Sequence, residues 1–139
     1  MHTDIILDNR YIDNILYSLK ENIVGVKKQA KNKLKKKSFI VKVNKKMQLS
    51  RIDLNSNLKE GYGEIICVNK LSILVAKEFF KFMKKFFIKN GTHMTWEYVL
   101  DDFIRNNKNI KLYVLKNQTF DWVNVNEPKD LSIARKKFN

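Results

Sequence analysis

The sequence predicts an α/β fold in which a mixed β-sheet is flanked by helices. Short β-rich runs alternate with amphipathic helical segments along the 139 residues, and 44% of the residues are hydrophobic, which is enough for a folded core. No internal repeat or linker divides the chain, so we expect one layered α/β structure, a single domain over residues 1–139.

The first half of the chain is expected to supply most of the strands. Its predicted segments are a strand over 4–8, a helix over 9–20, a strand over 22–26, a hairpin over 38–52 and a strand over 64–68. The helix is indicated by apolar residues at i, i+3, i+4 and i+7, and Asp8 or Asn9 can cap it. Residues 27–37 carry seven lysines in eleven positions, which is typical of a solvated loop.

The second half is expected to be mainly helical. Its predicted segments are helices over 70–91 and 95–106, strands over 109–115 and 120–125, and a last helix that begins near Pro128. The long helix has an apolar stripe with lysines on its other side, and Asn90 and Gly91 end it. Proline suits the first turn of a helix, and Asn126 or Glu127 can cap that turn.

The basic charge has two interpretations, which both remain open. The formal net charge is +14, as expected of a protein that binds nucleic acid without sequence preference. Lysine, asparagine and isoleucine are abundant while arginine is rare, however, a pattern that an AT-rich genome imposes on any protein. Because nucleic-acid binders often use arginine for bidentate contacts, the scarcity of arginine favours genome composition.

The location of the protein is predicted from what the sequence lacks. No apolar run approaches the roughly 20 residues that a membrane span needs, so no membrane partner is expected. The first ten residues lack the features of a signal peptide, and the single cysteine excludes an intrachain disulfide. The sequence therefore predicts a cytoplasmic protein.

Four stretches in order resemble a known family. The run "WVNVNEPKDLSIARKKF" resembles the closing motif of sugar-phosphate and phosphocholine nucleotidyltransferases, and "GYGEIICVNKLS" resembles their middle motif. "FIVKVNKKMQLSRIDL" looks like their hairpin followed by a serine and a basic residue, and "TDIILD" looks like the strand after their first metal-binding Asp. Within that family, the four stretches resemble most the cytidylyltransferase branch that activates choline phosphate or phosphonates.

The resemblance covers the C-terminal half to two-thirds of that fold and implies a truncated, Rossmann-like nucleotidyltransferase domain. The family's N-terminal half carries a glycine-rich loop whose backbone N–H groups cradle nucleotide phosphates. Here the four glycines, at 25, 61, 63 and 91, form no such loop. Without the first strands we expect Ile5, Ile6 and Leu7 to be uncovered, and we expect self-association or an upstream half-domain as partner.

The resemblance also implies a set of site residues. Asp4 and Asn126 would hold Mg²⁺, Glu64 would face the acceptor, and Arg51 would neutralise phosphate. Each residue has a structural alternative: Asp4 as an acid at a frayed terminus, Asn126 as a helix cap, and Glu64 and Arg51 as exposed strand residues.

The resemblance implies the transfer of a nucleotidyl group from CTP or another NTP to a phosphorylated alcohol or sugar. Because the phosphate-gripping loop is missing, we expect the chain to be inactive alone. The alternatives are a non-catalytic module that binds nucleic acid or another polyanion, and an inactive subunit that pairs with a partner.

Overall fold

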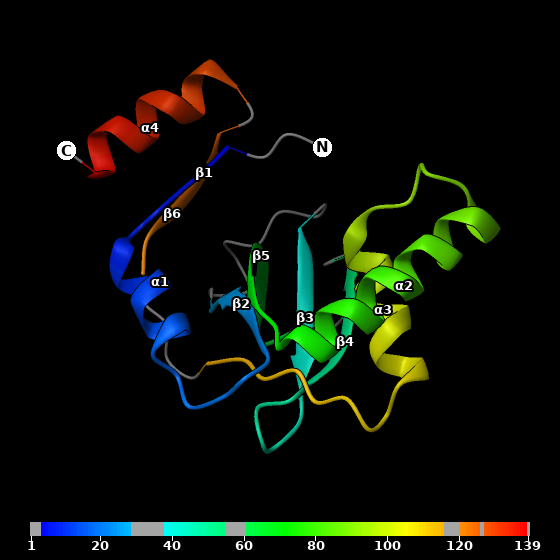
Figure 1. Cartoon of the computed structure of the whole chain (residues 1–139). Helices are drawn as coiled ribbons and strands as arrows, with labels where there is room; N and C mark the ends of the chain where they lie inside the picture. The colour runs from blue at the N-terminus through cyan, green and yellow to red at the C-terminus, as the bar shows by residue number, and fades with distance from the viewer. Residues whose placement is uncertain (1–3, 29–37, 55–60, 116–119, 126, 139) are drawn as a thin grey trace.

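The computed structural model describes residues 4–28, 38–54, 61–115, 120–125 and 127–138. Most of the predicted lysine loop, as well as Asn126, lies outside these residues. The helices and strands are β1 (Asp4–Leu7), α1 (Asn9–Leu16), β2 (Ile23–Lys27), β3 (Phe39–Val43), β4 (Leu49–Leu54), β5 (Gly63–Lys70), α2 (Ile73–Asn90), α3 (Trp96–Asn106), β6 (Trp122–Val125) and α4 (Pro128–Phe138). The predicted α/β class with flanking helices is confirmed (Figure 1).

The strands form two sheets in the described part of the chain, where a single mixed sheet was expected. The larger sheet has the order β2-β5-β3-β4, and the smaller one pairs β1 with β6. All of these strand pairs are antiparallel. A parallel bridge does occur outside the named strands, between Ile23 and Tyr113.

The main hydrophobic core lies between the larger sheet and the helices α2 and α3. Val41 and Ile52 from the sheet and Val99 and Phe103 from α3 are buried there. The ring of Phe79, on α2, meets the ring of Phe103 at 5.2 Å between centroids. In Figure 1, α3 lies alongside β4, which is an edge strand of the sheet.

A second apolar cluster connects the two sheets. Tyr11 and Ile15 of α1 pack with Ile23 and Ile66 of the larger sheet, and Trp122 of β6 packs against them. The hydroxyl of Tyr11 makes a hydrogen bond to the backbone of Val26, and burial raises the pKa of this phenol well above its usual range. The smaller sheet is thus fixed to the larger one through α1.

Several boundaries agree with the sequence. The long helix is capped by Ser72, whose hydroxyl accepts from the N–H of Val75, and it ends at Gly91 with a positive φ of 83°. The last helix begins at Pro128, as the junction "NVNEP" predicts. The hairpin turn is held by Asn44, whose side-chain oxygen accepts from the N–H groups of Lys46 and Gln48.

One predicted strand is wrong, and one predicted helix ends earlier than expected. Residues 109–115 form no strand; the N–H of Leu49 donates to the carbonyl of Leu112, and the N–H of Val24 donates to the carbonyl of Tyr113. The segment thus bonds to both edge strands at one end of the larger sheet, and in the described residues it makes isolated bridges there and no ladder (Figure 1). The first helix is also shorter than expected, and it ends before Leu19, which is fully exposed.

The prediction that the apolar side chains of β1 are uncovered is also wrong. Ile5, Ile6 and Leu7 are half-buried, because β1 pairs along its length with β6. The large exposed hydrophobic residues lie mainly on α1, α2 and α4 instead. None of the helices in the described residues is both long and apolar enough to span a membrane.

Candidate functional sites: a charge cluster and a groove

Opposite charges gather where β1 ends and β6 begins. The backbone N–H of Asp8, directly after β1, donates to the carbonyl oxygen of Asp121 at 3.0 Å. Lys137 at the end of α4 lies 2.8 Å from Asp121 Oδ1, and Lys27 at the end of β2 lies 3.5 Å from the same oxygen. The Nε of Arg10 donates to both carboxylate oxygens of Asp8 at 3.0 Å.

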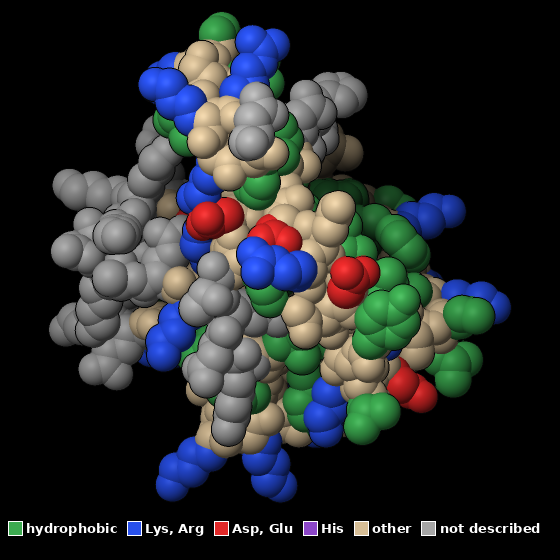
Figure 2. All heavy atoms as spheres, turned by 90° about the vertical axis from the view of Figure 1, so that its left-hand side faces the viewer, with side chains coloured by type: hydrophobic (Ala, Val, Ile, Leu, Met, Phe, Trp, Pro, Cys, Tyr) green, Lys and Arg blue, Asp and Glu red, His purple; other side chains and the backbone are tan. Residues whose placement is uncertain are grey.

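We refer to Asp8, Arg10, Lys27, Asp121 and Lys137 as the charge cluster. It contains three cations and two carboxylates, so it carries an excess of one positive charge. Figure 2 views the molecule from the side of β1 and β6, and acidic and basic side chains lie next to one another near the middle of that face. An additional anion can therefore bind here by replacing a carboxylate as partner of a lysine or arginine.

The cations of the cluster act on its two carboxylates. The hydrogen bond from Arg10 lowers the pKa of Asp8. The pKa of Asp121 is lowered by the hydrogen bond from Lys137 and, further, by the charges of Lys137 and Lys27, against a smaller opposing effect of burial. Both groups are therefore carboxylates at neutral pH.

Glu64 lies close to the charge cluster in the sheet. Its Cα pairs with that of Lys27 on one side and with that of Ile40 on the other, and Ile40 pairs in turn with Asp53. Because directly opposed residues of antiparallel strands share a face, Lys27, Glu64 and Asp53 lie in one row across the sheet. Glu64 is thus one strand away from a cation that contacts Asp121.

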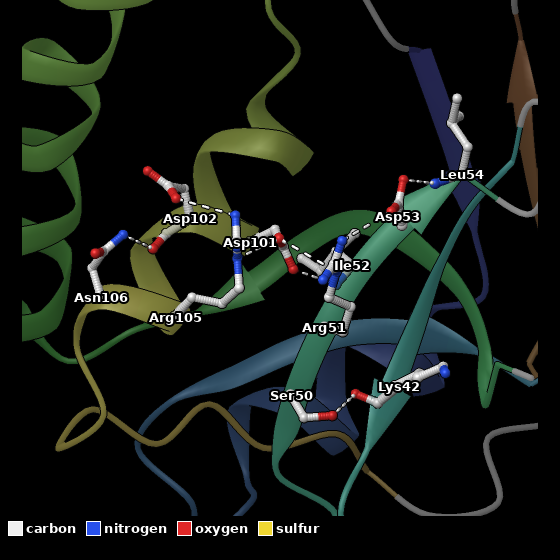
Figure 3. A network of polar contacts seen from close by, with 10 residues as sticks. All are labelled: Lys42, Ser50, Arg51, Ile52, Asp53, Leu54, Asp101, Asp102, Arg105 and Asn106. Carbon is white, nitrogen blue, oxygen red and sulfur yellow. Dashed lines mark hydrogen bonds and ion pairs between the residues drawn. The ribbon is translucent and has the colours of Figure 1, made fainter. Parts of the chain in front are cut away.

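Arg51 lies elsewhere, on the edge strand β4 (Figure 3). Its Nη2 is 3.2 Å from Asp53 Oδ2, and its Nε is 3.7 Å from Asp101 Oδ2. Strand β3 separates it from Glu64, so the two Cα atoms are roughly 10 Å apart or more. The structure therefore does not bring Arg51 and Glu64 into contact.

Asp101 is the centre of the network in Figure 3. Its side chain is only 6% exposed, and its Oδ1 accepts the backbone N–H of Ile52 at 2.7 Å. Its Oδ2 is 2.9 Å from the Nε of Arg105, which also contacts Asp102 at 3.2 Å. A buried carboxylate on α3 thus satisfies the outer edge of β4 and holds two arginines.

A groove of about 590 Å³ opens beside this network, between α2, α3 and β4. Lys85 and Lys89 line it from α2, and Arg105 and Tyr98 line it from α3. Burial, and then the charges of Asp53 and Glu97, raise the pKa of Tyr98, so its phenol stays protonated at neutral pH. By contrast, the cavity at the charge cluster, lined by Lys27, Asp121 and Trp122, has only about 10 Å³, which is room for about one water molecule, so a larger ligand there would lie on the surface.

Asp4, one of the two residues predicted to hold Mg²⁺, lies at the end of the smaller sheet away from the charge cluster. Asp4 opens β1, whereas ligands in open α/β sheets gather at the carboxyl ends of strands, and its Cα pairs with that of Val125, the residue before Asn126. Asn126 itself lies outside the described residues.

Metal binding by these residues therefore stays a prediction. No group of three His, Cys, Asp or Glu side chains that could hold a metal occurs in the part of the chain that the structure describes. On β6, the side-chain oxygen of Asn124 is buried and has no hydrogen-bond partner among the described residues.

Asp8, Asp121 and Lys137, which belong to the charge cluster, were not among the predicted site residues. Asp8 carried a usable signal, because it directly follows an apolar run, and ligands gather at the carboxyl ends of strands in open α/β sheets. The sequence around Asp121 and Lys137 has no such signal, because only the pairing of β1 with β6 brings these residues close to Asp8.

This arrangement of sheets and helices is the fold of solved nucleotidyltransferases. Over 95% of its length the chain matches 51% of the inositol-1-phosphate CTP transferase from T. maritima, with a TM-score of 0.69 and 15% identity. It also matches 50% of the CTP:phosphocholine cytidylyltransferase from Streptococcus pneumoniae over 87% of its length, with a TM-score of 0.58 and 11% identity.

A third similar structure, from Bacillus anthracis, is assigned as a glucose-1-phosphate thymidylyltransferase and was solved with a sucrose. The match covers 96% of this chain and 51% of that one, with a TM-score of 0.67 and 9% identity. The chain therefore spans about half the length of the solved structures that it matches. No family model and no curated protein matches the sequence.

Proposed function

We propose that this chain is the part of a nucleotidyltransferase that holds a phosphorylated alcohol or sugar and is inactive alone. The observation that supports this most is the charge cluster, because it gathers lysine and arginine where β1 ends and β6 begins, within a fold shared with such enzymes. In the proposed reaction the acceptor's phosphate oxygen attacks the α-phosphorus of CTP or another NTP, and pyrophosphate leaves.

Each residue has a defined part in this proposal. Lys27 and Lys137 contact the phosphate of the acceptor, and Asp121 keeps the two ammonium groups near each other. Glu64, in the same row as Lys27, accepts a hydrogen bond from a hydroxyl group of the acceptor. Asp4 and Asn126 would hold Mg²⁺, which would supply positive charge to offset the negative charge of phosphates. This role stays a prediction, because Asp4 opens β1 at the end of the strand away from the charge cluster. The phosphate-neutralising role of Arg51 stays a prediction, because its contacts are with Asp53 and Asp101.

Activity is tested by incubating the chain with CTP, Mg²⁺ and phosphocholine and measuring pyrophosphate. We expect none, because no phosphate-gripping loop is found in the sequence. Release of pyrophosphate that is abolished by Asp4→Ala or Asn126→Ala would overturn the proposed inactivity.

Binding is tested separately by titration with phosphocholine and inositol 1-phosphate. The proposal expects Lys27→Ala to weaken binding about three- to tenfold, as loss of one charge-assisted contact does. Lys46→Ala is the matched control, because Lys46 is exposed in the hairpin turn and has the same charge.

A second candidate function, a polyanion-binding module, is favoured by the surface of α2. This helix carries five exposed lysines, Lys77, Lys81, Lys84, Lys85 and Lys89, and one acidic residue, Glu78. A mixed-sequence oligonucleotide is expected to bind weakly, with affinity that falls steeply as salt rises. Tight, sequence-selective binding at moderate salt would make this candidate the better one.

A further inference from the structure

The groove between α2, α3 and β4 brings four cationic side chains together. Lys85 and Lys89, one helical turn apart, line the α2 wall, and Arg51 and Arg105 line the opposite side. No ion pair of either lysine is found among the described residues, whereas both arginines are paired with aspartates. The aspartates in the groove therefore leave the two lysines available for an anion from solution.

The guanidinium groups of the two arginines are held in place by aspartate carboxylates. Asp101 contacts both guanidinium groups, and Asp53 and Asp102 contact one each. All of these contacts use Nε or Nη2. Within the described ranges, Nη1 of neither arginine donates a hydrogen bond, so two amino groups, with two N–H donors each, remain on oriented guanidinium groups that are nearly half exposed.

The same groove has an apolar wall. Phe82 and Phe86 line it from α2, with their ring centroids 6.3 Å apart, and Tyr98 lines it from α3. A volume of about 590 Å³ lies in the range of pockets that bind small molecules. Aromatic side chains next to fixed cations are suited to a ligand that combines an apolar body with a compact anionic group.

We propose that this groove binds an organic phosphate with an aromatic or other apolar body. The phosphate lies between Lys85 and Lys89 on one side and the free amino groups of Arg51 and Arg105 on the other. The body of the ligand lies against Phe82, Phe86 and Tyr98. This site is separate from the charge cluster, and it does not depend on the nucleotidyl transfer proposed above.

Phenyl phosphate is the probe that tests this site. A calorimetric titration is expected to show saturable binding, with weaker binding of inorganic phosphate and none of phenol at the same concentrations. The double variant Lys85→Ala, Lys89→Ala should lose about ten- to a hundredfold in affinity, because each lysine contributes one charge-assisted contact. The matched control is Lys81→Ala, Lys84→Ala, which removes the same charge from the same helix outside the groove.

The location of binding is read from amide chemical shifts during the same titration. Shifts at Lys85, Lys89, Tyr98 and Arg105 are expected. The proposal is overturned if the two double variants lose affinity equally, if phenyl phosphate binds no better than inorganic phosphate, or if the probe does not bind. It is also overturned if the shifts lie at Lys27 and Asp121, because the phosphate would then occupy the charge cluster.

Discussion

Asp101 joins a helix to the edge of a sheet through a single carboxylate. It accepts the N–H of Ile52 at 2.7 Å and contacts Arg105 at 2.9 Å, with a side chain that is 6% exposed. Edge strands present unpaired backbone groups, and this carboxylate satisfies one of them on β4. The cost of removing it is therefore larger than that of an exposed ion pair.

We expect Asp101→Ala to lower the free energy of unfolding by about 2–4 kcal/mol, because it leaves a buried N–H unsatisfied and two arginines without their shared partner. Urea denaturation followed by circular dichroism measures this loss. Asp102→Ala is the control, since it removes a more exposed partner of Arg105 and should cost about 1 kcal/mol or less. Equal losses in the two variants would show that Asp101 has no special role.

Asp121 gives the protein a defined response to acid. Its folded-state pKa is lowered, chiefly by the hydrogen bond from Lys137, so its contribution to stability is present above the unfolded pKa of about 3.9. That contribution is lost as the pH falls through the folded pKa. The attachment of α4 should therefore weaken below about pH 4.

The measurement is the free energy of unfolding between about pH 6 and pH 2. Asp121→Asn should be less stable at neutral pH and should decline less steeply in acid than the wild-type chain. Asp13→Asn, on the exposed face of α1, serves as the control because no ion pair of Asp13 is found in the described residues. A variant curve parallel to the wild-type curve would contradict the linkage.

At the level of elements, the contact between α1 and β2 depends on a glycine. A Cβ on Gly25 would lie 2.3 Å from the carbonyl oxygen of Val68 and 2.6 Å from the hydroxyl of Tyr11. One of these obstacles is backbone and cannot turn away. The second apolar cluster, which fixes the smaller sheet to the larger one, therefore requires the absence of a side chain at this position.

We expect Gly25→Ala to cost about 2–3 kcal/mol or more by overpacking. Gly61→Ala should cost less, because its added methyl group meets mainly the end of the Ile40 side chain, at 2.6 Å. Thermal unfolding of both variants provides the comparison. If Gly25→Ala unfolds at the wild-type temperature, α1 does not pack against β2 as described.

The elements also show what the sequence can and cannot predict. The long helix was found because Phe79, Phe82 and Phe86 repeat with its period and Gly91 ends it. The segment 109–115 looked like a strand because its apolar residues are β-formers, but its hydrogen bonds go to two different strands, which local pattern cannot reveal. For the same reason, the charge cluster and the groove follow from long-range pairing and could not be read from spacing.

At the scale of the whole molecule, exposed hydrophobic residues gather where α1 ends and α2 begins. This apolar patch consists of Leu16, Tyr17, Leu19, Ile73 and Leu74, all at least 58% exposed. The two ends are held together by the Nζ of Lys70, which donates to the carbonyl oxygens of Leu16 and Ser18. Figure 2 shows hydrophobic side chains toward the lower right of its face.

We expect the isolated chain to self-associate through this patch, because contiguous exposed apolar surface marks contact sites. Light scattering should show the mass rising with concentration, and rising further with salt as repulsion between lysines is screened. The double variant Leu19→Ser, Leu74→Gln should show a smaller rise of mass with concentration than the wild-type chain. Ile133→Ser, which changes an exposed residue of α4, is the control and should associate as the wild-type chain does. A monomeric wild-type chain at every concentration would contradict the expectation.

We propose above that the charge cluster, in a chain that matches half of a nucleotidyltransferase fold, binds the phosphate of the acceptor. The most direct test of this proposal is a titration of the isotope-labelled chain with inositol 1-phosphate, followed by amide chemical shifts. We expect saturable shifts at Asp8, Lys27 and Asp121, which Lys27→Ala should weaken and Lys46→Ala should leave unchanged. Absence of shifts, or shifts confined to residues outside the cluster, would contradict it.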